Sequence, residues 1–225
     1  MKVQIDGQDH RCGAMRQGPQ TASDNENLPI PIDMAEKLGW YRPHLDTSMS
    51  WIRELDLDED APIIDVGGGA STLIDDLLDE GYESLAVLDI SDSALANSRK
   101  RLGRQADLVM WLSGDITTYA LPPNRFELWH DRALLHFLTE ATQQEAYRSN
   151  LLNAVKPAGH VIIGVFSHEA PPKCSGLPVQ RYDPEQLSDM LGNQFELVRH
   201  DKKMHITPGD VEQMYLYCQF RRIAD

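Results

Sequence analysis

The chain has 225 residues, and its 35 acidic and 21 basic side chains give a formal net charge of −14. This length suits one α/β domain with a substantial core, and the acidic balance argues against a nucleic-acid partner, because that affinity depends on neutralised phosphates. The sequence shows no run of 18 or more apolar residues and no apolar signal-peptide segment, and its three cysteines form no even disulfide framework. We therefore expect a cytoplasmic protein without a membrane contact, and the sequence leaves its oligomeric state open.

Residues 1–27 are rich in Gln, Gly, Asp and Asn and show no sustained hydrophobic period, which predicts a flexible segment. His10 and Cys12 lie there without a third or fourth ligand at useful spacing, so we expect no metal site. The composition changes at Leu28, and residues 28–225 predict a single domain. Its first part, residues 28–60, is expected to end in a helix with one apolar face, formed by Leu45, Met49, Ile52 and Leu55.

The most informative stretch is residues 62–92. An apolar run over residues 63–66 predicts a buried strand, and three glycines from Gly67 to Gly69 follow it, where the backbone can turn sharply and approach a ligand. Ser71 can cap the next helix, which Gly81 ends. A second apolar run over residues 85–88 leads into Asp89. This order of strand, glycine loop, helix, strand and acid is typical of a nucleotide site in a doubly wound sheet.

The residues around the glycine loop also limit which nucleotide fits. A dinucleotide fingerprint needs glycine or alanine where this chain has Thr72. Asp65, two residues before the loop, would repel a diphosphate and attract a cationic ligand. A ligand with an ammonium group, a ribose and no phosphate therefore fits better than NAD, which makes a dehydrogenase a distant alternative.

The rest of the chain continues the alternation of strands and helices. Apolar runs predict further strands at residues 108–112, 126–129, 161–166, 195–198 and 214–221, the last two joined by a polar stretch. Cap and stop residues predict helices that begin at Ser91, Thr139 and Asp183. Asp115 follows its strand as Asp65 and Asp89 follow theirs, which predicts one ligand site at the carboxyl ends of the strands.

These motifs resemble those of the class I S-adenosylmethionine-dependent methyltransferases. The matching segments are Asp65-Val-Gly-Gly-Gly-Ala-Ser, Asp89 and Gly114-Asp115-Ile116, in the family's order and spacing, and the likeness covers roughly residues 40–220. The resemblance implies a single doubly wound, seven-stranded, mostly parallel sheet that ends in an antiparallel hairpin. It implies S-adenosylmethionine as cofactor, S-adenosylhomocysteine as product, and cofactor contacts at Asp65, Gly67, Gly69, Ser71, Asp89, Ile90, Asp115, Ile116 and His130.

The segment after the fourth predicted strand borders the transferred methyl group in that family. By this resemblance Asp131 and His136 are candidate general bases. Asp131 could instead form an ion pair or turn with Arg132, and His136 could be a hydrogen-bonded histidine under a helix. The Asp/Asn-Pro-Pro-Tyr motif of enzymes that methylate nucleic-acid bases is not present, which further disfavours that chemistry.

The loop over residues 167–182 is long for a connection in a compact domain, and such loops are often functional. His130-Asp-Arg-Ala and Cys174-Ser-Gly-Leu-Pro resemble a bacterial subgroup of class I methyltransferases whose substrates are mostly unassigned. The likeness implies acceptor contacts at His168, Lys173, Cys174, Arg181 and Tyr182. In class I methyltransferases the segment before the first motif commonly covers the cofactor and the substrate, and by that resemblance Trp40, Tyr41 and His44 are candidates for a lid. Packing roles for the cysteine and the two aromatic residues remain alternatives.

The sequence thus predicts a methyltransferase that acts on a small-molecule acceptor, since the long loop favours an enclosed pocket. A methyltransferase acting on lysine in a folded protein is the main alternative, because an acidic surface could attract a basic target. A cofactor-binding module without catalysis is a third hypothesis.

Overall fold

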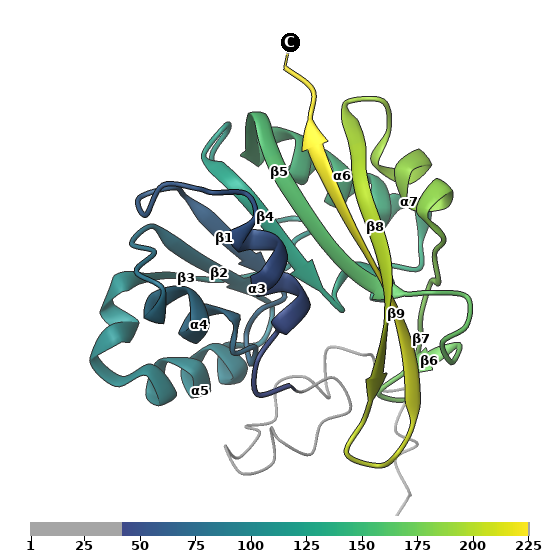
Figure 1. Cartoon of the computed structure of the whole chain (residues 1–225), viewed down its shortest axis with the longest axis horizontal. Coiled ribbons are helices and arrows are strands. Elements are labelled where there is room, and N and C mark those ends of the chain that lie inside the picture. The colour runs from purple at the N-terminus through teal and green to yellow at the C-terminus, as the bar shows by residue number, and fades with distance from the viewer. Residues whose placement is uncertain (1–41, 225) are drawn as a thin grey trace, which may run out of the picture.

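A computed structural model describes residues 42–224 as a seven-stranded sheet with helices on both faces (Figure 1). The strand order is β3-β2-β1-β4-β5-β9-β8, in which the first five strands are parallel and β9 runs antiparallel to both of its neighbours. The predicted fold class is confirmed. The strands of this sheet are β1 (Ile63–Val66), β2 (Leu85–Asp89), β3 (Val109–Ser113), β4 (Phe126–Arg132), β5 (Val155–Phe166), β8 (Phe195–Ile206) and β9 (Glu212–Arg222).

Helices cover the sheet in two layers, each with its own apolar core. Buried side chains of α3, α4 and α5 share one core, and those of α6 and α7 share the other, on the opposite face. The short strands β6 and β7 pair with each other within the loop that follows β5. The remaining elements are α3 (Asp46–Arg53), α4 (Leu73–Asp79), α5 (Asp92–Leu102), η1 (Gly103–Leu108), η2 (Leu135–Phe137), α6 (Ala141–Ala154), β6 (Lys173–Cys174), β7 (Leu177–Pro178) and α7 (Pro184–Leu191).

The helix ends follow the expected capping chemistry, with two exceptions. Ser91 caps α5 and Asp183 caps α7, and the side chain of each accepts a hydrogen bond from a backbone N–H in the first turn. Ser71 is not the cap of α4: Thr72 occupies that position, and the Ser71 hydroxyl accepts from the backbone N–H of Leu73 at 3.1 Å. The cap of α6 is likewise one residue beyond Thr139, at residue 140, where a glutamate forms a capping box.

Three strands are longer than the apolar runs that predicted them. β4 continues to Arg132, so His130 and Asp131 belong to the strand rather than to a loop after it. β5 begins at Val155 instead of residue 161, and β8 continues to Ile206 instead of residue 198. The outer part of β8 is rich in polar residues because only β9 pairs with it, so most of its side chains face solvent. A search for apolar runs therefore misses the end of this hairpin.

Within residues 42–224, no helix combines the length and the hydrophobicity that a membrane span requires.

Candidate functional site

The glycine loop lies directly against the acid at the end of the neighbouring strand. The backbone N–H of Gly69 donates to Asp89 Oδ2 at 2.8 Å, and that of Ser91 donates to Asp89 Oδ1 at 2.8 Å. A Cβ atom added to Gly69 would lie 2.6 Å from the Asp89 carboxylate, so only glycine fits there. Burial raises the pKa of Asp89, and the two N–H donors partly offset this effect. The loop and the acid thus form one fixed unit.

A buried network of hydrogen bonds lies next to the glycine loop. His130 Nδ1 lies 2.7 Å from Asp65 Oδ1, and His130 Nε2 lies 2.8 Å from Ser48 Oγ, with all three side chains at most 2% exposed. This network links β1, β4 and α3. Asp65 Oδ2 is buried and has no hydrogen-bond partner among the described residues. It lies close to the glycine loop, because a Cβ atom added to Gly68 would be 2.1 Å from it. A buried carboxylate oxygen without a donor is costly, which marks this position as a candidate contact for a cationic ligand.

The third acid also lies at the carboxyl edge of the sheet. Asp115 Oδ1 accepts from the backbone N–H and the hydroxyl of Thr117, at 2.8 and 2.7 Å. The Gly114 N–H donates to the Asp89 carbonyl at 3.0 Å, which ties the ends of β2 and β3 together. Ile90 is 46% exposed beside this edge, whereas Ile116 is a core residue at 4% exposure. The structure therefore brings the three predicted acids and the glycines to one edge of the sheet.

Asp131, a predicted general base, has its carboxylate fully enclosed. It is 0% exposed, and its Oδ1 accepts from the Leu134 N–H at 3.0 Å. Its Oδ2 accepts from the Tyr147 hydroxyl at 2.8 Å and from the Leu135 N–H at 3.2 Å. Burial raises the pKa of Asp131 to about 6. The geometry gives this carboxylate a clear structural task, which is to hold the turn after β4 against α6.

His136, the other predicted base, is also 0% exposed and is surrounded by aromatic rings. Its ring centroid lies 4.6 Å from those of Phe137 and Phe166, and its Nδ1 accepts from the Phe166 N–H at 3.3 Å. Burial, with a smaller contribution from the charge of Arg132, lowers the pKa of His136 to about 3. The imidazole is therefore neutral near pH 7, and a base this weak would be a poor proton acceptor.

The residues expected to contact the acceptor differ widely in their exposure. His168 and Lys173 are exposed, whereas Cys174 and Tyr182 are buried at 2% and 3%. Arg181 Nη1 donates to two backbone carbonyls of its own loop, at 3.0 and 3.1 Å. Burial raises the pKa of the Cys174 thiol and raises that of Tyr182 to about 12. The predicted lid residues Trp40 and Tyr41 lie outside the described residues.

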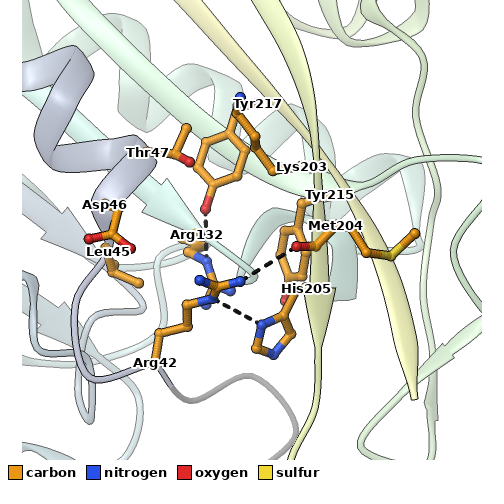
Figure 2. Close-up of a pocket in the computed structure, with 10 residues that line it drawn as sticks. All are labelled: Arg42, Leu45, Asp46, Thr47, Arg132, Lys203, Met204, His205, Tyr215 and Tyr217. Carbon is orange, nitrogen blue, oxygen red and sulfur yellow. Dashed lines mark hydrogen bonds between the residues drawn. The ribbon is translucent and has the colours of Figure 1, made fainter. Parts of the chain in front are cut away.

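The sequence did not predict the polar cavity that the structure contains on the α3 side of the sheet. This cavity of about 190 Å³ lies between the start of α3, the end of β4 and the outer part of the β8–β9 hairpin (Figure 2). We refer to it below as the hairpin cavity. Of the predicted site residues, none lines it, although Arg132 directly follows Asp131. Its lining residues are Arg42, Leu45, Asp46, Thr47, Arg132, Lys203, Met204, His205, Tyr215 and Tyr217.

Tyrosines and a histidine of the hairpin place two arginines at this cavity. Arg132 Nε donates to the Tyr217 hydroxyl at 3.0 Å, and its guanidinium carbon lies 4.5 Å from the ring centroid of Tyr215. Arg42 Nε donates to His205 Nδ1 at 3.1 Å (Figure 2). No short sequence signal could have found this group, because its members come from three distant segments.

The cavity is physically joined to the glycine-loop unit. The Thr72 hydroxyl, at the start of α4, donates to the Arg42 carbonyl at 3.1 Å. On the other side, Arg132 lies two residues along β4 from His130, which contacts Asp65. The glycine-loop unit and the hairpin cavity are therefore connected through the start of α4 and through β4.

Comparisons with known proteins agree with this arrangement. Residues 63–159, less than half of the chain, match the family model described as a methyltransferase domain. That stretch contains the glycine loop, all three strand-end acids and β4. No curated protein sequence matches the chain at a significant level.

Several solved structures are similar in fold. A protein from Methanosarcina mazei described as an S-adenosylmethionine-dependent methyltransferase is 13% identical, with a TM-score of 0.64 over 77% of this chain and 98% of that one. The 1,6-didemethyltoxoflavin-N1-methyltransferase of Burkholderia thailandensis, solved with its namesake ligand and S-adenosylhomocysteine, is 18% identical, with a TM-score of 0.62 over 80% and 77%. The [4+2]-cyclase SpnF is 14% identical, with a TM-score of 0.61 over 84% and 87%. These likenesses show a shared fold, and the cyclase shows that the fold serves more than one reaction.

Proposed function

We propose that the chain is an S-adenosylmethionine-dependent methyltransferase and that its acceptor is a small molecule. The observation that carries the proposal is the glycine-loop unit, in which Gly69 donates to Asp89 while the buried Asp65 Oδ2 lacks a donor within the described residues. A cofactor with a cationic end and a ribose matches both features, whereas a dinucleotide would bring a diphosphate toward Asp65. The methyltransferase-domain match over residues 63–159 and the methyltransferases of similar fold support the same assignment.

The residues of the chain fit this cofactor in a defined way. Asp65 would pair with its ammonium group, Asp89 would accept from the ribose hydroxyls, and Asp115 would face the adenine. When bound, the cofactor supplies a methyl group on a sulfonium, which is already a good leaving group. The protein then has to align the acceptor with that methyl group and exclude water, and in well-oriented reactions alignment alone can contribute about 7–11 kcal/mol.

In this proposal, methyl transfer does not require Asp131 or His136 to act as a general base. Asp131 is held by three donors and His136 is neutral and buried, so neither side chain is well suited to take a proton from an acceptor. An acceptor whose attacking atom is already deprotonated at working pH, such as a thiolate, needs no protein base. We therefore assign methyl transfer here to positioning, with Asp131 and His136 maintaining the structure around the site.

The competing hypothesis, lysine methylation in a folded protein, fits the hairpin cavity less well. The cavity has Arg42, Arg132 and Lys203 in its lining, with Asp46 as the acid among them. A lysine side chain would bring its own positive charge toward these cations. The volume of the hairpin cavity, about 190 Å³, also lies below the roughly 300–1,000 Å³ of pockets that hold drug-sized ligands. Both features favour a small acceptor.

Calorimetric titration with S-adenosylmethionine, S-adenosylhomocysteine and NAD tests the proposed cofactor. We expect both adenosyl compounds to bind and NAD not to bind. Asp89→Ala should weaken their binding at least about 30-fold, because the ribose loses a charged acceptor worth about 2 kcal/mol. Asp92→Ala, an exposed acid three residues away, is the matched control and should bind normally. Binding of NAD alone would overturn the proposal.

A further inference from the structure

We propose that Ser48 and His130 are positioning residues that determine how tightly the chain binds the ammonium end of its cofactor. They act through Asp65, whose carboxylate they hold in one orientation, with one oxygen left for the ligand. This inference rests on the proposed function, because it takes the ligand to be S-adenosylmethionine. It changes the expected role of His130 from a cofactor contact to a residue that orients one, and it adds Ser48, which lies in none of the sequence motifs.

The register of two neighbouring strands explains why His130 meets Asp65. β1 and β4 are parallel, and Asp65 lies opposite His130, as Ile63 lies opposite Leu128 two residues earlier. Alternate residues of a strand point to the same face, so both pairs lie on the face that α3 covers. The apolar pair belongs to the core under that helix, whereas the polar pair lies at the carboxyl ends of the strands. His130 Nδ1 therefore reaches Asp65 Oδ1 directly, at 2.7 Å.

Ser48 fixes the other side of the imidazole. Its Oγ lies 2.8 Å from His130 Nε2, and its side chain is buried. An ionised carboxyl group only accepts hydrogen bonds, so the ring donates from Nδ1 to Asp65. A neutral imidazole that donates from Nδ1 accepts at Nε2, and the Ser48 hydroxyl is the donor there. With both ring nitrogens bonded, the imidazole keeps one tautomer and one orientation.

Asp65 Oδ2 is the oxygen that this arrangement leaves for a ligand. It is directed at the glycine loop, since a Cβ atom on Gly68 would lie 2.1 Å from it, and it has no hydrogen-bond partner among the described residues. An ammonium group supplies both the missing donor and the opposite charge. The terminal torsion of an aspartate is soft, so the hydrogen bond from His130 to Oδ1 is what keeps Oδ2 directed at the ligand.

Stability alone does not account for a polar network at this place. Other side chains of α3 that face the same core, Met49 and Ile52, are apolar and at most 2% exposed. Replacing a buried polar group together with its partners by apolar residues of similar volume is often neutral or stabilising. A network in which one buried oxygen lacks a donor is less favourable still. A ligand that completes the network explains why polar residues occupy this part of the core.

The test compares S-adenosylhomocysteine with its deaminated analogue, in which hydrogen replaces the ammonium group. Calorimetric titration of the full chain measures both affinities, and their ratio gives the preference for the ammonium group. We expect the unmodified protein to prefer S-adenosylhomocysteine at least about tenfold, because the ammonium group forms a hydrogen bond between charged groups. Asp65→Asn should remove most of this preference.

Variants of the two positioning residues should change the same ratio. Ser48→Ala should reduce the preference about three- to tenfold, by weakening S-adenosylhomocysteine and leaving the analogue nearly unaffected. His130→Asn keeps an N–H near the position of Nδ1, so it should retain more of the preference than His130→Gln, whose amide corresponds to Nε2. In a protein that already carries Asp65→Asn, Ser48→Ala should not change the ratio further.

Two other serines are matched controls. Ser50 is exposed and lies two residues from Ser48 on α3, so Ser50→Ala should change neither affinity. Ser98 is 2% exposed, and its hydroxyl donates to the Gly69 carbonyl at 2.6 Å. Ser98→Ala should weaken both ligands alike, because it disturbs the glycine loop and leaves the hydrogen bonds of Asp65 in place. Thermal unfolding followed by circular dichroism verifies that each variant is folded.

Three results would overturn this proposal alone. The unmodified protein could bind both compounds equally, or folded Ser48→Ala and His130→Gln proteins could retain the full preference. Equal weakening of both ligands by Ser48→Ala would show that the network only supports the loop. In each case the adenosyl compounds still bind, so the methyltransferase assignment stands. If neither compound binds to the unmodified protein, the proposed function itself is overturned, and this inference with it.

Discussion

The two faces of β4 carry different kinds of polar residue. Trp129 and Asp131 point toward α6, where the Tyr147 hydroxyl accepts from Trp129 Nε1 at 3.0 Å and donates to Asp131 Oδ2 at 2.8 Å. His130 and Arg132 lie on the α3 side, where one contacts Asp65 and the other lines the hairpin cavity. The α6 face is closed by its own hydrogen bonds, whereas the α3 face borders both the glycine-loop unit and the cavity. Adjacent residues of one strand thus serve stability on one face and, in the proposed function, ligand binding on the other.

The strongest way to test the α3 face is to remove His130. His130→Leu should lower the free energy of unfolding by about 3 kcal/mol or more, because it leaves the buried Asp65 carboxylate without its donor. His130→Asn keeps an N–H donor and should cost less. Urea unfolding measures both. A loss below about 1 kcal/mol for the leucine variant would show that the chain of Ser48, His130 and Asp65 contributes little.

A methyl group added to the glycine loop should act on the ligand. Gly69→Ala places a Cβ 2.6 Å from the Asp89 carboxylate and 2.9 Å from Ala94 Cβ, so the acid has to move. We expect S-adenosylhomocysteine to bind at least about 100-fold more weakly, or about 2.7 kcal/mol. Gly209→Ala is the matched control, since its nearest neighbour would be Thr207 Oγ1 at 3.9 Å. Calorimetry that finds equal affinity in both variants would contradict the proposed cradle.

Asp131 and His136 are buried groups whose pKa values shift in opposite directions, so their contributions to the pH dependence of stability oppose each other. The pKa of Asp131 rises from 3.8 to about 6, so between these values the folded state holds a proton that the unfolded state has released. This contribution makes stability fall as pH rises through that window. The pKa of His136 falls from 6.5 to about 3, so its contribution makes stability rise with pH over much of the same range. In the unmodified protein the two contributions largely cancel between about pH 4 and 6.

Asp131→Asn removes one contribution and leaves the other. Relative to the unmodified protein, the variant should gain about 1.4 kcal/mol of stability per pH unit as the pH rises from about 4 to 6. Urea unfolding at pH 4.5, 5.5 and 6.5 measures this difference in slope. Parallel pH profiles would mean that Asp131 is not a buried acid with a raised pKa.

The smallest expected effect comes from the hydroxyl that closes the α6 face. Tyr147→Phe removes one hydrogen bond from Trp129 and one from Asp131, which should cost about 1–2 kcal/mol of unfolding free energy. Because the Tyr147 hydroxyl contacts neither the glycine loop nor the lining of the hairpin cavity, the affinity for S-adenosylhomocysteine should stay within about twofold. A large loss of affinity without a loss of stability would break the distinction between the two faces.

The same strand explains what the sequence could and could not predict. The glycine loop and the three acids were predictable because they lie in short segments between residues 63 and 115. Each acid lies within an apolar run or at most three residues after one. Asp131 stood out for the same reason, since the apolar run of the fourth strand ends at Trp129. The strand in fact continues to Arg132, and its alternation turns Asp131 away from the cavity. Successive side chains of a strand point to opposite faces of the sheet. A strand end that is misplaced by a few residues therefore changes which side chains are expected to face the site.

The hairpin cavity could not be predicted from local patterns. Its lining comes from residues 42–47, from Arg132 and from residues 203–217, which are far apart in the sequence and share no motif. The outer part of β8 also lacks the apolar run that reveals a strand, because its side chains mostly face solvent. Only the pairing of β8 with β9, from His205 with Gln213 back to Phe195 with Arg222, brings these residues beside the start of α3.

A crystal structure of the chain with S-adenosylhomocysteine tests the central claim most directly. We predict that the ribose hydroxyls contact Asp89, that the amino group lies near Asp65, and that the sulfur faces the hairpin cavity beside Arg132. Such a complex would join the glycine-loop unit and the cavity into one methyl-transfer site. A ligand that binds away from Gly67 to Gly69, or whose sulfur points away from the cavity, would contradict the account.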